Sequence, residues 1–349
     1  MEYFLVCTAC NAVYPMAYRS QICKCGSILE VNYKRKVKIS KSDGFWDYEN
    51  VLPESRYKKI IIGNTPMVET NEKGLMLKLE LYNPTRSFKD RGSVIEAAKA
   101  KEYGYKTLSV ASTGNMAYSL AYYSKIYKIK AHVFISKSAS KDKVRNIIKT
   151  HDAVLHEVDG DFSKAQSEAI AYARATKSFL AGDYCYRKEG QKTLGYEIIM
   201  QCKNASQIIV PVGNATLISG IYKALYEMKS TGNINKLPRL IAVQARTCAP
   251  LVRAFNTGKK IAYEKPRTAA DAIAVGMPTY GEQAILALKS TKGTALAVTE
   301  KEMHNMQKQL YDTYGILAEL ASASVIAAYY KLNLGKKGKT IAIITGGNV

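Results

Sequence analysis

Short apolar runs rich in β-branched residues alternate with helical patterns along most of the chain, and this alternation constrains the fold more than any other feature. Six runs are predicted to be strands: Thr107–Ala111, Ala131–Ile135, Ala153–Val158, Ile208–Val212, Leu240–Gln244 and Thr340–Ile344. Helical patterns follow the first two, at Met116–Ile126 and Lys141–Lys149. Such alternation is typical of parallel sheets covered by helices. Ligands of these sheets lie at the carboxyl ends of the strands, so a site is expected there.

The formal net charge is +22 over 349 residues, which raises the question of nucleic-acid binding. The basic residues are scattered in short runs such as Lys34–Lys36, and no basic helix with interleaved aromatic residues is present. We therefore expect the charge to favour a small anionic substrate, and we expect no specific nucleic acid. No apolar run is long enough to span a bilayer and no secretory signal opens the chain, so we expect a cytoplasmic protein without membrane contact.

Four of the seven cysteines cluster near the start of the chain, as Cys7-x2-Cys10 and, after a gap of 12 residues, Cys23-Lys24-Cys25. Two thiol knuckles can supply four thiolates to a tetrahedral zinc, so the predicted ligands are Cys7, Cys10, Cys23 and Cys25. The zinc would be structural, because four cysteines leave no open coordination position. The alternative is four free thiols, and the single residue inside the second knuckle is in its favour. The other three cysteines lie far apart, which is a cytosolic pattern and not a disulfide framework.

Two predicted strands are followed by segments suited to binding anions. Ser112-Thr113-Gly114-Asn115 opens one helix, and Gly213-Asn214-Ala215-Thr216-Leu217 opens another. Amides and hydroxyls at a helix N-terminus bind carboxylates, and small residues let amides approach a phosphate closely. The second segment is neither a GxGxxG fingerprint nor a Walker loop. The alternative for both segments is an ordinary helix cap after a turn.

A lysine in a charged setting lies upstream, in Asn83-Pro84-Thr85-Arg86-Ser87-Phe88-Lys89-Asp90-Arg91-Gly92. Burial near cationic groups would make the Lys89 amine a nucleophile toward carbonyl carbons. For a lysine taken alone, a solvated helix start is the simpler interpretation.

Together these segments resemble the threonine synthases, which are enzymes of pyridoxal 5'-phosphate (PLP). Asn83–Gly92 matches their cofactor-lysine motif, Asn-Pro-Thr-Gly-Ser-Phe-Lys-Asp-Arg-Gly, at nine of ten positions. Other segments agree in the same order along the chain: Gly63–Met67, Ser112–Asn115, Arg187–Thr193, Val210–Asn214, Gln244 with Cys248–Pro250, and Thr345–Gly346. The cysteine-rich start with Leu29-Glu30-Val31 is similar to the ribbon that many of these proteins carry.

The resemblance implies PLP fold type II, the tryptophan synthase β-like class. This is an α/β fold of two doubly wound three-layer α/β/α domains, here with a small zinc-ribbon-like segment. The expected parts are the segment at residues 1–35, a large PLP-binding domain at 36–96 and 186–349, and a small mobile substrate domain at 97–185. A homodimer is the common form of the family, so we expect one here.

The resemblance also implies roles for individual residues. Lys89 would hold PLP as a Schiff base and would then move protons. The cofactor would contact Phe88, Asn115, Gly213, Asn214, Ala215, Thr216, Leu217 and Thr345. The loop at 213–217 would bind the cofactor phosphate, and Thr345 would bond the pyridine nitrogen. The substrate would contact Ser112, Thr113, Gly114 and Met116.

Three departures from the family pattern bear on the substrate. Arg86 stands where the motif has glycine, and the phosphate loop reads Asn214-Ala215-Thr216-Leu217 where threonine synthases usually place a glycine and an asparagine. Ala181-Gly182-Asp183 stands where the family shows an Asn-Ser pair associated with the phosphate of O-phosphohomoserine. Alanine and glycine donate no side-chain hydrogen bond, so Arg187 is the expected donor to the substrate phosphate and Arg86 is a second one.

The expected activity is that of a threonine synthase, which converts O-phospho-L-homoserine and water to L-threonine and phosphate. One alternative keeps PLP and changes the reaction to a β-replacement or β-elimination, as in cysteate synthase, a sulfhydrylase, or a threonine or serine dehydratase. The other alternative is a binding or regulatory protein without turnover, whose charge and ribbon serve nucleic acid. The joint presence of Lys89, Asn115 and Thr345 argues against it.

Overall fold

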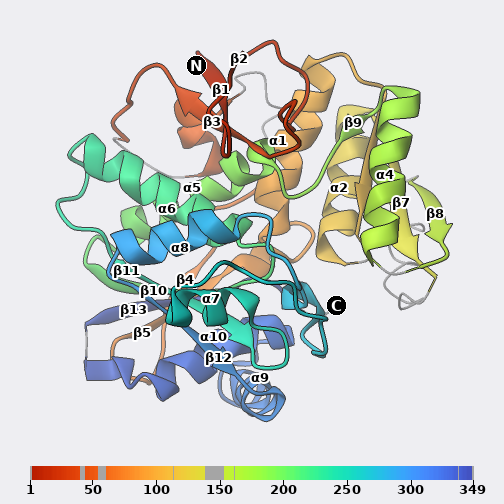
Figure 1. Ribbon diagram of the computed structural model, residues 1–349. Coiled ribbons are helices and arrows are strands. Elements are labelled where there is room, and N and C mark those ends of the chain that lie inside the picture. The colour runs from red at the N-terminus through yellow and green to blue at the C-terminus, as the bar shows by residue number, and fades with distance from the viewer. Residues whose placement is uncertain are drawn as a thin grey trace. The chain divides into compact units, whose positions relative to one another are not determined.

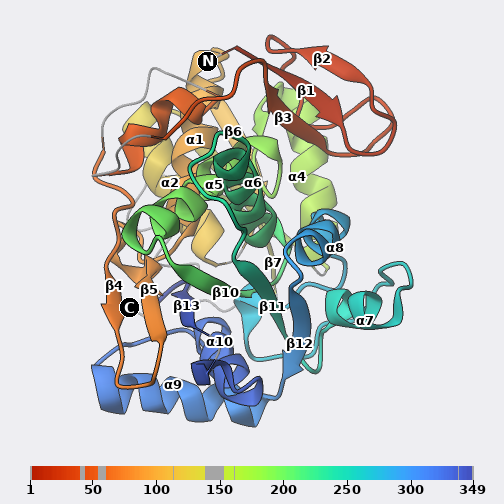
Figure 2. The ribbon, with the colours of Figure 1, turned by 90° about the vertical axis from the view of Figure 1, so that its left-hand side faces the viewer.

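The structure is a computed structural model that describes residues 2–39, 44–53, 60–112, 114–137, 153–160, 162–336 and 338–347. The chain divides into two compact units (Figure 1, Figure 2). Unit 1 comprises residues 1–36, 48–61 and 89–190, and unit 2 comprises 37–47, 62–88 and 191–349. The domain boundaries expected from the sequence, at 35, 96 and 185, stay a prediction.

The N-terminal segment of unit 1 folds into a small antiparallel sheet. Its strands are β1 (Tyr3–Cys7), β2 (Val13–Pro15) and β3 (Leu29–Tyr33), in the order β2-β1-β3. Alternate residues of β1 are buried, as in a strand with one covered face, and Leu5 lies opposite Val31. Cys7 ends β1, and the other three clustered cysteines lie in the turns beside the sheet.

A second sheet of unit 1 is fully parallel, with the strand order β8-β7-β6-β9. Its strands are β6 (Thr107–Ala111), β7 (Lys130–Ser136), β8 (Val154–Val158) and β9 (Phe179–Leu180). The helices among the described residues of this unit are α1 (Lys89–Glu102), α2 (Asn115–Tyr127), α4 (Phe162–Thr176) and the start of α5 (Cys185–Gln201). The three strands and the helix at 116–126 expected from the sequence are confirmed. The helix expected at Lys141–Lys149 lies outside the described residues.

Unit 2 is built on a six-stranded sheet with the order β12-β11-β10-β13-β5-β4. Its strands are β4 (Met67–Glu69), β5 (Leu75–Leu79), β10 (Ala205–Pro211), β11 (Arg239–Ala245), β12 (Thr294–Val298) and β13 (Lys339–Ile344). All neighbours are parallel except the edge strand β4, which is antiparallel to β5. The expected strands at 208–212, 240–244 and 340–344 are confirmed, whereas β5 and β12 were not expected.

Helices cover both faces of this sheet, with α6 on the side away from α10 (Figure 1, Figure 2). The helices are α6 (Thr216–Ser230), α7 (Pro250–Thr257), α8 (Gly281–Ser290), α9 (Glu300–Tyr314) and α10 (Leu320–Lys331). Short 3-10 turns are η1 (Phe45–Val51), η2 (Glu80–Tyr82), η3 (Asp271–Ile273) and η4 (Leu334–Lys336). In the part of the chain that the structure describes, no helix combines the length and the apolar character needed to cross a membrane.

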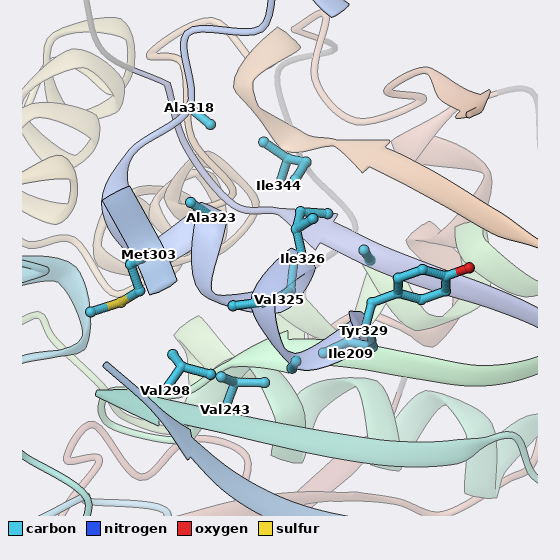
Figure 3. Packing of buried hydrophobic residues seen from close by; sticks show 14 of the residues in the cluster. Ile209, Val243, Val298, Met303, Ala318, Ala323, Val325, Ile326, Tyr329 and Ile344 are labelled. Carbon is cyan, nitrogen blue, oxygen red and sulfur yellow. The ribbon is translucent and has the colours of Figure 1, made fainter. Parts of the chain in front are cut away.

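Helix α10 lies at the centre of the apolar core of unit 2. Nine of its twelve residues are buried, which explains why its sequence has no polar stripe. Val325, Ile326 and Tyr329 belong to one cluster with Ile209 of β10 and Val243 of β11 (Figure 3). This packing fixes the carboxyl ends of the strands, where the candidate site of unit 2 lies.

Candidate active site

The segment before Lys89 pairs with the chain just past β13. Ser87 forms an antiparallel bridge with Gly346, and the amide of Phe88 donates to the carbonyl oxygen of Thr345 at 2.9 Å. These residues belong to unit 2, and Lys89 is the first residue of α1 in unit 1. Lys89 is half-buried. The two residues before the lysine thus have backbone partners at the end of the sheet.

A serine that the sequence did not reveal holds the Thr345 side chain. Oγ1 of Thr345, a buried residue, lies 3.0 Å from Oγ of Ser322 on α10. Ser322 Oγ also donates to the carbonyl oxygen of Gly346 at 3.0 Å and accepts from its amide at 3.1 Å. Ser322 therefore fixes the turn that presents Thr345. No local signal marks this serine, because it lies in an Ala- and Ser-rich stretch typical of any buried helix.

The loop from Gly213 to Ala215 joins β10 to α6 and has little room for side chains. A Cβ at Gly213 would lie 2.8 Å from the carbonyl oxygen of Ala272. Ala215 has a φ of 63° and is the N-cap, so no side chain caps α6, and the first turn has no acidic residue. Asn214 accepts a hydrogen bond from Thr279 Oγ1 at 3.2 Å. This loop can present the first amides of α6 to an anion. The remaining expected residues, Thr216 and Leu217, are buried in that first turn.

The residues expected near a substrate carboxylate lie where β6 leads into α2. Gly114 is the N-cap of α2, and its amide donates to Ser112 Oγ at 3.4 Å. Asn115 is half-buried and Met116 is buried in the first turn, which has no acidic residue. Thr113 lies outside the described residues. The first turns of α2 and α6 thus keep the partial positive charge of a helix N-terminus, which favours an anion.

Arg86 adopts a backbone conformation that favours glycine. Its φ is 60°. Its carbonyl oxygen accepts a hydrogen bond from the amide of Gly347 at 3.1 Å. Its Nε is buried and has no hydrogen-bond partner among the described residues. A guanidinium N–H without an acceptor beside the turn that carries Thr345 is suited to an anionic ligand.

Arg187, the donor expected for the substrate phosphate, has a protein partner instead. It is fully buried in unit 1, where its guanidinium forms an ion pair with Glu96 of α1. Glu96 was not among the expected site residues, because a glutamate inside a helix usually faces solvent. Ala181 and Gly182 are buried as well. The predicted contact between Arg187 and a phosphate stays a prediction, and its geometry is taken up below.

A buried ionic network in unit 2 holds the Gly63–Met67 segment. Glu197 accepts hydrogen bonds from the amides of Asn64 at 2.9 Å and Thr65 at 2.8 Å. Lys78 Nζ lies 2.5 Å from the Glu197 carboxylate, and both side chains are almost fully buried. Thr65 Oγ1 also donates to Glu80 at 2.7 Å. Sequence spacing did not indicate these partners, because Lys78 and Glu197 lie far apart in the chain.

The four clustered cysteines converge in the structure. Their sulfur atoms lie within 4.8 Å of one another, with 3.5 Å between Cys7 and Cys25 and 3.6 Å between Cys10 and Cys23. Sulfurs around a tetrahedral zinc with Zn–S bonds of about 2.3 Å are separated by roughly 3.8 Å. The donor set therefore fits zinc, and the short second knuckle does not prevent convergence. All seven cysteines lie in the described residues, and none of them forms a disulfide.

A family model described as pyridoxal-phosphate dependent enzyme matches residues 59–346. The chain is 36% identical over 371 aligned residues to the threonine synthase of Methanocaldococcus jannaschii, covering 98% of this chain and 91% of that protein. It is 34% identical to the threonine synthase of Methanosarcina acetivorans, covering 99% of this chain and 92% of that protein.

Solved structures share the fold. Maize serine racemase superposes with a TM-score of 0.72 at 23% identity, covering 82% of this chain and 89% of that one. A threonine deaminase of Solanum lycopersicum superposes with a TM-score of 0.70 at 22% identity, covering 82% and 84%. At these identities the likeness shows the fold alone, and the expected PLP fold type II is confirmed.

Proposed function

This chain belongs to the family of pyridoxal-phosphate-dependent enzymes, and we propose that it is a threonine synthase. The reaction converts O-phospho-L-homoserine and water to L-threonine and phosphate. The observation that carries the proposal is the similarity to two threonine synthases over nearly the whole of each chain.

The residues present fit PLP. Position 213 has no room for a Cβ, and the uncapped first turn of α6 offers amides to a phosphate. Thr345 offers a hydroxyl to a pyridine nitrogen, and Lys89 offers the amine that a PLP aldehyde requires. When bound, PLP supplies an electron sink that stabilises negative charge at the substrate carbons. We assign cofactor contacts to the residues expected from the sequence.

We assign the proton transfers to Lys89. Its amine takes protons from Cα and then from Cβ of the substrate, and loss of the Cβ proton lets phosphate leave Cγ. The amine returns protons to Cγ and Cα, water adds its hydroxyl at Cβ, and the remaining proton of water balances the one that the departing phosphate takes up. A single base can serve these steps because a lysine side chain is long and rotates about four bonds.

We assign the substrate carboxylate to the start of α2. Ser112 and Asn115 flank an N-cap glycine there, and the first turn carries no acid that would repel an anion. Backbone amides and two polar side chains can together satisfy both carboxylate oxygens. This contact orients the substrate and adds no chemistry of its own.

We also propose that the four cysteines hold a structural zinc. Two of them are buried and two are exposed, and all four sulfurs converge on one point. With no histidine or carboxylate in the set, the ion has no open position for catalysis. A homodimer in the cytoplasm remains the expectation from the family resemblance.

A second reaction is favoured by one observation. Arg187 is paired with Glu96, and Ala181 and Gly182 provide no side-chain donor for a phosphate. A β-elimination from serine or threonine needs no such donor. The test measures phosphate release from O-phosphohomoserine and ammonia release from threonine with one preparation of PLP-loaded protein. Phosphate release with threonine formation supports the synthase, and ammonia release without it supports the elimination.

A further inference from the structure

Helices α1 and α5 approach so closely in unit 1 that glycine is required on both. A Cβ added at Gly190 would lie 1.9 Å from the carbonyl oxygen of Arg91. A Cβ added at Gly92 would lie 2.6 Å from Cγ of Arg187. The Arg187 side chain is therefore wedged against the first turns of α1, the helix that begins with Lys89.

The Arg187 guanidinium is almost fully used by protein acceptors. Nε donates to the Gly182 carbonyl at 3.1 Å, and Nη1 donates to the Lys89 carbonyl at 3.4 Å. Nη2 donates to Ser93 Oγ at 3.2 Å and to the Glu96 carboxylate. An arginine has five N–H donors, so four bonds leave one donor for any ligand.

Both carboxylate oxygens of Glu96 have hydrogen-bond partners in the protein. Its second oxygen accepts the Gly182 amide at 2.8 Å, and the side chains of both Glu96 and Arg187 are 0% exposed. Burial raises the pKa of Glu96 to about 7, although the Arg187 charge and the Gly182 amide oppose this. A phosphate dianion that took Arg187 would leave a buried carboxylate without its counter-ion, which is costly.

We propose that Arg187 and Glu96 form a positioning pair that sets the backbone of Lys89, and that Arg187 is not the residue that binds the substrate phosphate. The pair reaches Lys89 through its carbonyl oxygen and reaches the first two turns of α1 through Ser93 and Glu96. This inference rests on the proposed function only where it is tested by kinetics with O-phosphohomoserine. The test by PLP binding needs no substrate.

The two roles predict opposite effects of Glu96→Gln, which preserves the shape and removes the charge. For a positioning pair, kcat with O-phosphohomoserine falls roughly 10- to 100-fold, because small displacements of a reacting group have effects of that size. Affinity for PLP, followed by the visible absorbance of the apoprotein titrated with PLP, also falls. For a phosphate donor, the variant frees Arg187, so KM for O-phosphohomoserine and the inhibition constant of inorganic phosphate both decrease.

Arg187→Lys provides the second variant, because it keeps the charge opposite Glu96 and loses the fork of donors. A positioning role predicts a loss in kcat and in PLP affinity with little change in phosphate inhibition. Glu30→Gln is the matched control, since Glu30 pairs with Lys188, the next residue of α5, at 2.6 Å. Glu30 lies on β3 and bonds the residue next to Arg187, so its loss should leave kcat and the PLP titration within about 2-fold of the wild type if only the Arg187–Glu96 pair positions Lys89.

The inference is overturned if a folded Glu96→Gln or Arg187→Lys variant keeps PLP affinity and kcat at the wild-type level, whether or not KM and phosphate inhibition change. Circular dichroism confirms that each variant is folded, and a misfolded Glu96→Gln leaves the decision to Arg187→Lys. A wild type that does not act on O-phosphohomoserine refutes the proposed function, and the PLP titrations then decide the positioning role alone.

Discussion

Arg86 combines a left-handed backbone with a charged side chain. Its φ of 60° is one that a residue with a Cβ rarely adopts, and it lies three residues before Lys89. Such strain costs about 1 kcal/mol and persists only where the surroundings enforce it. Since we propose that Arg187 serves Glu96, we propose Arg86 as the arginine of the expected pair that binds the substrate phosphate.

Replacing Arg86 by glycine should separate strain from recognition. Arg86→Gly relieves the backbone, so the free energy of unfolding should rise by up to about 1 kcal/mol. Loss of the guanidinium should raise KM for O-phosphohomoserine by roughly 10-fold. Denaturant unfolding and steady-state kinetics measure the two effects. Lys128→Gly is the control, because Lys128 is an exposed αL residue at the end of α2 with a φ of 56°.

The control should gain similar stability with unchanged KM. An Arg86→Gly variant with unchanged KM would remove Arg86 from substrate recognition and leave its positive φ as a feature of the turn alone.

Strand β5 shows what local sequence patterns cannot reveal. Its sequence, Leu-Met-Leu-Lys-Leu, has no β-branched residue and carries a lysine, so it was not expected to be a strand. The lysine, Lys78, is accommodated because Glu197 lies opposite it across 119 residues of chain. By contrast, β6 and β13 were predicted because each is a short apolar run with β-branched residues. Such a run indicates a buried strand without knowledge of any distant partner. Glu96, Ser322 and Glu197 likewise have partners distant in sequence, namely Arg187, Thr345 and Lys78, so no local pattern indicates their contacts.

Breaking the Lys78–Glu197 pair should strongly destabilise unit 2. Lys78→Met leaves the Glu197 carboxylate buried without its counter-ion, which lowers the free energy of unfolding by about 3–5 kcal/mol. Lys339→Met is the matched control, because Lys339 pairs with Glu69 on the surface, at 41% and 74% exposure. It should change stability by less than about 1 kcal/mol. Equal effects in urea unfolding would show that the buried network contributes no more than a surface pair.

The cysteine ribbon should depend on its metal. Cys7→Ser combined with Cys23→Ser should reduce bound zinc from about one equivalent to none and should lower the thermal midpoint of unfolding. The effect should extend beyond the ribbon, because Gln21 bonds the Leu180 carbonyl at 2.8 Å and Tyr33 bonds Glu189 at 2.5 Å. Elemental analysis of protein expressed with zinc available measures the metal, with Cys202→Ser as control. Metal-free wild-type protein would contradict the zinc assignment.

For the whole molecule, the fold class and the cofactor family were predictable from the sequence, whereas the predicted domain boundaries stay a prediction. Motifs such as Asn83–Gly92 are contiguous, and they place a lysine and its neighbours without knowledge of the fold. The chain passes from one unit to the other several times. One of these passages falls between Phe88 and Lys89, inside that motif. No composition change marks this point, because the boundary is set by packing of distant segments.

The central claim is most directly tested by the fate of oxygen from water. The PLP-loaded protein is incubated with O-phosphohomoserine in water enriched in oxygen-18, and the products are identified by mass spectrometry. The account predicts threonine carrying one heavy oxygen and phosphate carrying none, because water adds at Cβ while the carbon–oxygen bond at Cγ breaks. Lys89→Ala should form neither product. Homoserine with labelled phosphate, or no product from the wild type, would contradict the account.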